Sequence, residues 1–342
     1  MDTMPTNSET RDLKQVLEEL REHSGALPVS GLYMLSDLAG QKLRIFRAEF
    51  DAYPAPQRRH LVQALVELAE ASFEVNFNAI FRHCLQDASD EVRAAAIDGL
   101  WEDEDVALIG PFLIMLRSDP SALVRAAAAA ALGRFVLAGE LERLDPPVQT
   151  RITSELLTAI HLKGEGIEVR RRAIESVAYS CTSEVFEVLE TAYFAEDEQM
   201  RLSAVVGMGR TCDQRWKRVL LTELESDSAA MRYEAALASG HLMLEEAVPT
   251  LAALIDDADS QIREAAIWAL GQVHGDEAKQ ALLDALEDAD RETEEAIADA
   301  LAEQALLEGE LDFALYELDK DGDDDLMDDS LFPLWAADDE LE

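Results

Sequence analysis

The stretch from Asp259 to Asp290 reads DSQIREAAIWALGQVHGDEAKQALLDALEDAD and contains one complete structural unit of this chain. After Asp259, a residue type that caps helices, apolar residues recur at the three-and-four spacing that forms one helix face. The Gly275-Asp276 turn separates this predicted helix from a second one with its own apolar face, formed by Ala278, Leu282, Leu283 and Leu286. A lone pair of such helices cannot bury its apolar face, so the pattern predicts copies that stack on one another.

The rest of the chain repeats this unit. An apolar residue followed by arginine recurs from Val92-Arg93 to Ile262-Arg263, and successive arginines are 32, 45, 31, 31 and 31 residues apart. Thr293-Glu294 stands at the equivalent position another 31 residues later, with both residue types changed. Predicted N-caps recur in phase at Ser89, Ser121, Asp197, Ser228, Asp259 and Asp290, with Gly166 as the exception, and helix-ending glycines recur at Gly133, Gly209, Gly240 and Gly271. A fixed period in this range predicts an all-α fold, a right-handed α-solenoid (superhelix) of stacked antiparallel helix pairs.

The pattern D-x-x-[IVM]-R-x-x-A-[AIV]-x-A-L-G of Asp259 to Gly271 resembles the HEAT repeat, specifically the short version named after phycobiliprotein lyases. The resemblance extends over roughly Pro56 to Glu303. It implies that the first helix of each pair lines the inner surface of the stack. Repeats of this kind serve scaffolds, adaptors and a few enzymes, so the resemblance indicates fold more strongly than function.

Three parts of the chain are expected. Residues 1–55 are predicted to be N-terminal helices that cap the solenoid, residues 56–307 the HEAT-repeat solenoid, and residues 308–342 an acidic, disordered tail. The 45-residue interval places extra residues near Ala138 to Gln149, which form either a tolerated surface loop or a lip that bends the stack. In the tail, Leu331 to Trp335 is an apolar cluster between acidic flanks, typical of a short docking segment.

The charge balance restricts the partners. The chain has 29 Lys and Arg against 71 Asp and Glu, a formal net charge of −42, which repels phosphate backbones, so nucleic acid is not expected. A basic protein is favoured as partner, although the acidity can also serve solubility or adaptation to salt. Three scattered cysteines, a polar N-terminus and the absence of a long apolar run predict a monomeric cytoplasmic protein without a membrane partner.

The arginine of each apolar-Arg step recurs next to acidic residues such as Asp90, Asp119, Glu168, Asp197, Asp227 and Asp259. We expect a structural ladder, in which guanidinium and carboxylate groups satisfy helix ends and fix the repeat spacing, because functional sites seldom recur in every unit. The members of this arginine ladder are Arg93, Arg125, Arg170, Arg201, Arg232 and Arg263.

Other positions share the phase of the ladder but vary in chemistry, as a partner-specific surface would. These positions predict a cationic and aromatic ridge on the inner face, with ordinary solvated helix surface as the alternative. The ridge consists of Arg134, Arg172, Tyr179, Arg210, His241, Trp268 and Gln272, and the same face carries Glu175, Ser203 and Glu234.

Signals for chemistry are sparse. In the tail, Asp319, Asp321, Asp323 and Asp325 partly resemble a calcium loop, but Asp324 stands where glycine is needed and Ser330 where the bidentate glutamate is needed, so weak ion condensation is the alternative. None of the six histidines is followed by glutamate, which excludes the di-iron chemistry of the deoxyhypusine hydroxylases that share this repeat type. Phosphate-loop and HExxH motifs are absent, so we expect no cofactor and no catalytic residues. The function predicted is that of a protein-binding scaffold or adaptor using the inner face of the solenoid; the alternative is a bilin lyase or isomerase of the phycobiliprotein lyase type.

Overall fold

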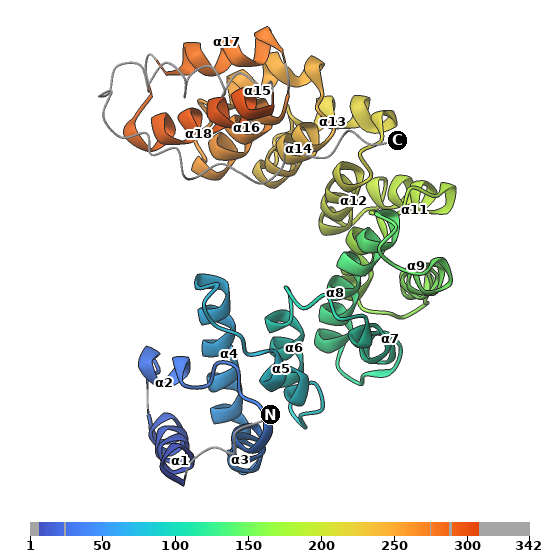
Figure 1. Ribbon diagram of the computed structural model, residues 1–342. Coiled ribbons are helices and arrows are strands. Elements are labelled where there is room, and N and C mark those ends of the chain that lie inside the picture. Colours follow the sequence, from blue (N-terminus) through green and yellow to red (C-terminus); the bar gives the residue numbers. More distant parts are fainter. Residues whose placement is uncertain (1–6, 24, 274, 287–288, 308–342) are drawn as a thin grey trace, which may run out of the picture. The chain divides into compact units, whose positions relative to one another are not determined.

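The computed structural model describes residues 7–307 apart from residues 24, 274, 287 and 288 (Figure 1). The chain divides into two compact units, unit 1 (residues 1–220) and unit 2 (residues 221–342), which are described separately. This division falls inside the predicted solenoid. The calcium-loop candidates Asp319, Asp321, Asp323 and Asp325 and the Leu331–Trp335 segment lie outside the described residues.

Unit 1 is built of helix pairs. The first helices of its repeats pack in succession, each against the next; they are α4, α6, α8, α10 and α12. The helices α5, α7, α9 and α11 are their partners. Fully buried aromatic rings, among them Phe46, Phe81 and Phe112, belong to its core. Its elements are α1 (Asn7–Glu22), α2 (Val29–Tyr33), α3 (Gly40–Phe50), α4 (Ala55–Ala71), α5 (Asn78–Cys84), α6 (Asp90–Gly99), η1 (Val106–Leu108), α7 (Ile109–Ser118), α8 (Ala122–Glu140), α9 (Pro146–His161), α10 (Ile167–Val177), α11 (Ser183–Tyr193), α12 (Glu198–Arg210) and η2 (Gln214–Trp216).

Unit 2 repeats this arrangement on a smaller scale. The first helices α14, α16 and α18 pack in succession, with α15 and α17 behind them, around a core that includes Leu251, Ile262 and Ile297. Its elements are α14 (Ala229–His241), η3 (Glu245–Ala247), α15 (Val248–Leu254), α16 (Ser260–Gln272), α17 (Asp276–Ala285) and α18 (Arg291–Leu307), and α13 (Lys217–Glu223) contains the unit boundary. The regular elements of the described residues are all helical, so the predicted all-α stack of antiparallel helix pairs is confirmed.

Helix starts follow the capping residues that the repeat predicts. The side chain of Asp197 accepts a hydrogen bond from Met200 N at the start of α12, and that of Asp259 accepts one from Gln261 N at the start of α16. These bonds satisfy backbone donors that a helix leaves without intrahelical partners.

The predicted helix-ending role of the glycines needs correction at Gly133. This residue lies inside α8, which continues to Glu140, and a Cβ added there would lie 3.0 Å from Ser176 Oγ. In unit 2 a Cβ at Gly240 would lie 2.9 Å from Ala269 Cα. The side-chain hydrogen of these glycines therefore allows close packing of neighbouring first helices.

The extra residues of the long interval are largely helical. They lengthen α8 to 19 residues, and Pro146 begins α9, where its missing N–H is tolerated. By length and composition α8 alone among the described helices is apolar enough to span a membrane. Half of its apolar stretch, however, is buried within the protein. Its packing against α7, α9 and α10 makes it a core helix of unit 1.

Candidate partner-binding site and arginine ladder

The ladder arginines Arg93, Arg125 and Arg232 each bond to two neighbouring turns. In unit 1, Arg93 Nε and Nη2 donate to the two carboxylate oxygens of Asp119 at 2.9 and 2.8 Å, in the turn after α7. Its Nη1 donates to Asp87 O at 2.8 Å, in the turn before its own helix. One planar guanidinium thus satisfies a carbonyl beyond a helix end and holds the next turn through a bidentate ion pair.

The same geometry recurs in both units. Arg125 bonds both carboxylate oxygens of Glu165 at 3.0 and 2.7 Å and also Asp119 O. Arg232 bonds Asp257 at 2.9 Å and Ser226 O at 2.8 Å. The charge-assisted bond from Arg125 holds the pKa of the Glu165 carboxyl below its ordinary value.

Arg58 has the same contacts, although the sequence pattern missed it. Its Nε and Nη2 donate to Asp87 at 2.6 and 2.8 Å, and its Nη1 donates to Tyr53 O. The residue before it is Gln57 rather than an apolar one, which hid it from the repeat search. The available signal was Asp87, a carboxylate in the turn of the following repeat.

Asp119 is among the acidic residues that the sequence suggested, but it pairs with the arginine of the preceding repeat, and the partners Asp87, Glu165 and Asp257 were not among them. Asp87, Asp119 and Asp257 each precede the next arginine by six positions, and each also accepts a backbone N–H two residues later. The acidic residues nearer to the arginines are engaged elsewhere: Asp197 and Asp259 cap their own helices. Where a ladder arginine has a carboxylate partner, as Arg93, Arg125 and Arg232 do, that partner comes from the following repeat, while the turn before its own helix supplies carbonyl acceptors.

Two ladder arginines, Arg170 and Arg201, lack a carboxylate at this position of the following repeat. The position six residues before Arg201 holds Ala195, and the one before Arg232 holds Ser226. Arg170 Nε donates to Ile160 O at 3.0 Å, and Arg201 Nη1 donates to Ala195 O at 3.0 Å. Arg263 Nη1 likewise donates to Asp257 O at 3.0 Å.

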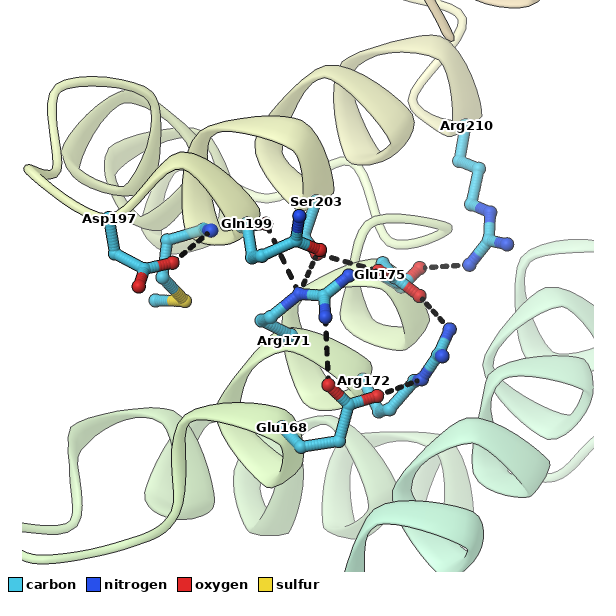
Figure 2. A network of polar contacts seen from close by, with 9 residues as sticks. Glu168, Arg171, Arg172, Glu175, Asp197, Gln199, Ser203 and Arg210 are labelled. Carbon is cyan, nitrogen blue, oxygen red and sulfur yellow. Dashed lines mark hydrogen bonds and ion pairs between the residues drawn. The ribbon is translucent and has the colours of Figure 1, made fainter. Parts of the chain in front are cut away.

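A different polar network connects α10 to α12 (Figure 2). Glu175, which is buried, accepts a hydrogen bond from Ser203 Oγ at 2.6 Å. Arg171 Nε donates to the same Ser203 oxygen at 3.0 Å and to Gln199 O at 3.1 Å. These bonds link the two helices where the ladder lacks its carboxylate.

Three predicted ridge residues meet at the edge of this network. Arg172 Nη1 donates to Glu175 Oε2 at 3.1 Å, and Arg210 Nη1 donates to Glu175 O at 2.7 Å (Figure 2). The Arg210 guanidinium lies 5.1 Å from the centroid of the Tyr179 ring, in cation–π geometry. The Arg172 side chain remains 43% exposed. Arg172, Tyr179 and Arg210 form what we call the cationic cluster of unit 1.

Arg134 is placed differently. Its guanidinium lies 4.8 Å from the Phe135 ring centroid and 5.5 Å from that of Phe112. Its Nε and Nη2 atoms are buried without a hydrogen-bond partner, and burial lowers its pKa to about 10. Arg134 is thus a desolvated cation among aromatic rings and not an exposed contact residue.

The remaining ridge residues lie in unit 2. The Trp268 ring on α16 is half-buried and meets the His241 ring on α14 edge-on, with centroids 5.0 Å apart. Gln272 follows one turn after Trp268, and its Nε2 is buried without a hydrogen-bond partner. Within each unit, part of the predicted ridge is therefore brought together.

A hollow with a volume of about 960 Å³ lies along α9 in unit 1. Hydroxyl side chains line it, including Thr158 and Thr182. Thr158 Oγ1 donates to Ser154 O, and Thr182 caps α11, so these hydroxyls are engaged in holding helices. Among the described residues no group of three His, Cys, Asp or Glu side chains is arranged to hold a metal ion.

Residues 77–150 and 217–302 match the family model described as HEAT repeats. The model does not distinguish the phycobiliprotein-lyase type, which stays an expectation. No curated protein matches the sequence.

Among solved structures, yeast importin-β (Kap95p) is 12% identical with a TM-score of 0.48, covering 86% of this chain and 46% of its own. Human deoxyhypusine hydroxylase in complex with glycerol is 16% identical with a TM-score of 0.32, and the match covers 87% of this chain and 97% of the hydroxylase chain. YibA of E. coli is 18% identical with a TM-score of 0.44, covering 80% and 98%. This chain spans about half the length of the importin-β structure, and TM-scores below 0.5 are too low to transfer a function or partner.

Proposed function

Starting from a chain of HEAT repeats, we propose that this protein is a scaffold or adaptor that binds another protein through the first-helix face of its units. The observation that carries the proposal is the cationic cluster of Arg172, Tyr179 and Arg210. Arginine and tyrosine are enriched among the residues that dominate binding energy at interfaces. Here they are held in place by Glu175, which is itself bonded to Ser203 on the neighbouring helix.

The ordering of this cluster supports binding by a preformed surface. The buried Glu175 acts as a common acceptor, so Arg172 and Arg210 lose less conformational entropy when a partner arrives. An arginine fork held in this way suits a carboxylate or a carbonyl of the partner. The net charge of −42 favours a partner with a basic surface and disfavours nucleic acid. We place this scaffold in the cytoplasm as a monomer.

The test is a pull-down in which the full chain, immobilised on a support, is incubated with a lysate of its source cells. We expect partner capture at about 0.15 M salt, and its loss when Arg172→Ala and Arg210→Ala are combined. The matched control combines Arg143→Ala and Arg151→Ala, two exposed arginines of unit 1 with the same total charge change.

Thermal melts of both double variants separate a lost contact from a lost fold. Equal capture by the cluster variant, the control and the wild-type chain would reject the cationic cluster as the binding site.

A further inference from the structure

The two units differ in charge far more than in construction. Unit 1 contains 35 Asp and Glu and 24 Lys and Arg, whereas unit 2 contains 36 Asp and Glu and 5 Lys and Arg. The formal net charges are therefore −11 and −31, so most of the negative field originates from the smaller unit.

The first-helix face of unit 2 is repetitive, which places its residues relative to one another. A Cβ at Gly240 would touch Ala269 on α16, and a Cβ at Gly271 would touch Ala300 on α18 in the same way. The glycine and the alanine of the second contact each lie 31 residues after those of the first. Asp299 on α18 therefore occupies the place that Trp268 occupies on α16.

Helical spacing and the 31-residue repeat place three acidic residues on the same face as Trp268. Glu264 precedes Trp268 by one helical turn, and Glu303 follows Asp299 by one turn on the adjacent helix. Glu264, Asp299 and Glu303 are exposed, while the indole ring is half-buried and lies against Gly240.

The arginines of these three helices are engaged away from this group. Arg232 bonds Asp257, and Arg263 bonds the carbonyl of the same residue. Arg291 pairs with Glu295 one turn later on α18. These contacts lie at the starts of the helices, so they leave the charge of Glu264, Asp299 and Glu303 uncompensated by the helices' own arginines.

We propose that the face formed by Glu264, Trp268, Asp299 and Glu303, here called the acidic aromatic face, binds a lysine- or arginine-rich segment of a partner protein. A basic side chain lying over the indole ring gains a cation–π contact. The flanking carboxylates pair with the neighbouring basic residues of the segment. Charge complementarity selects this occupant, because an acidic or neutral segment would meet repulsion or no attraction.

This inference rests on the proposed function and adds a second face of opposite character. The cationic cluster of unit 1 presents guanidinium groups, and the acidic aromatic face of unit 2 presents carboxylates. An adaptor with these two faces binds two segments of different chemistry at the same time.

A fluorescein-labelled decalysine peptide, titrated with the full chain at 0.15 M salt and followed by anisotropy, provides the test. We expect Asp299→Asn with Glu303→Gln to weaken binding about tenfold, because these carboxylates contact the peptide directly. The control combines Asp256→Asn with Glu277→Gln, two exposed carboxylates of unit 2 away from this face. It makes the same charge change and should weaken binding by no more than about twofold.

The indole is tested separately with Trp268→Leu, which keeps apolar volume against Gly240 but removes the ring face. We expect about threefold weaker peptide binding with little change in melting temperature. Equal effects of the two carboxylate pairs would show that the peptide condenses on the acidic molecule as a whole, and would overturn the inference. That result would leave the lysate capture by the cationic cluster unaffected, so the two proposals fail separately.

Discussion

At the scale of single residues, the ladder arginine accounts for much of the order in the repeat. One side chain satisfies the carbonyl of its own preceding turn and the carboxylate of the following repeat, as Arg232 does with Ser226 O and Asp257. Lysine, with a compact ammonium group, cannot reproduce this planar, two-directional arrangement.

Replacing Arg232 with alanine is expected to lower the free energy of unfolding by about 2–4 kcal/mol, because the largely buried Asp257 loses its partner. Thermal or urea unfolding measures the change. The control is Arg291→Ala, whose guanidinium is 90% exposed, and it should cost no more than about 0.5 kcal/mol. Equal melting temperatures for the two variants would contradict the structural role of the ladder.

Acid should weaken unit 1 through Glu165. Arg125 keeps the pKa of this carboxyl below its ordinary value, so the ion pair contributes stability above the unfolded-state pKa and loses it as the pH falls through the folded-state pKa. Wild-type melting temperatures should therefore fall on acidification below about pH 4.3. The melting temperature of Glu165→Gln should be lower than that of the wild type at pH 7 and should fall less on acidification. The exposed control Glu187→Gln should show the wild-type dependence of melting temperature on pH.

At the scale of helices, the sequence predicted what depends on local spacing. The caps at Asp197 and Asp259 and the Pro146 start of α9 follow from residues within one turn of each other. The sequence could not predict that Gly133 lies inside α8, because the reason is its contact with Ser176 on α10.

The candidate site shows the same limit. The repeat phase correctly placed Tyr179 next to Arg210 in the adjacent repeat. It did not foresee that Arg134, in the same phase, is buried against Phe112, because that ring comes from α7 in the second layer of helices. Nor did it indicate that Glu175 and Ser203 are buried as a bonded pair.

The missing carboxylate at Ala195 can be supplied. Ala195→Asp places an acceptor where Asp257 stands in its repeat, within the reach of Arg170 and of the Asp197 N–H. We expect a gain of about 0.5–1.5 kcal/mol in unfolding free energy, measured by urea titration. Ala195→Asn, which adds the acceptor without the charge, should gain less. A loss of stability in the aspartate variant would show that Arg170 cannot turn from Ile160 O.

At the scale of the whole molecule, charge and contact surface have different tasks. The acidic field, concentrated in unit 2, acts over distances longer than any side chain, and we expect it to accelerate the approach of the basic partner proposed above. The contacts proposed for the cationic cluster and for Trp268 would act only after docking, so we expect them to set the dissociation rate of the complex.

Raising the salt concentration above about 0.15 M shortens the screening length below about 8 Å. We expect the association rate of decalysine with the full chain to fall steeply across this range while its dissociation rate changes little. Stopped-flow anisotropy measures both rates. A salt effect confined to dissociation would mean that the field of the molecule does not steer the encounter.

The two-directional grip of each arginine also has a consequence for how such a chain can change its length. A 31-residue segment of the regular array contains one ladder arginine and one turn that faces the ladder arginine of the preceding repeat. A copied or deleted segment of this size therefore keeps each ladder arginine one repeat away from the following turn, and the carboxylate bond forms where that turn carries an acidic residue, as Asp257 does for Arg232. Gene duplication can extend or shorten the array in whole steps, and a segment ending in a turn like that of Ala195 would mark its junction by a weaker bond.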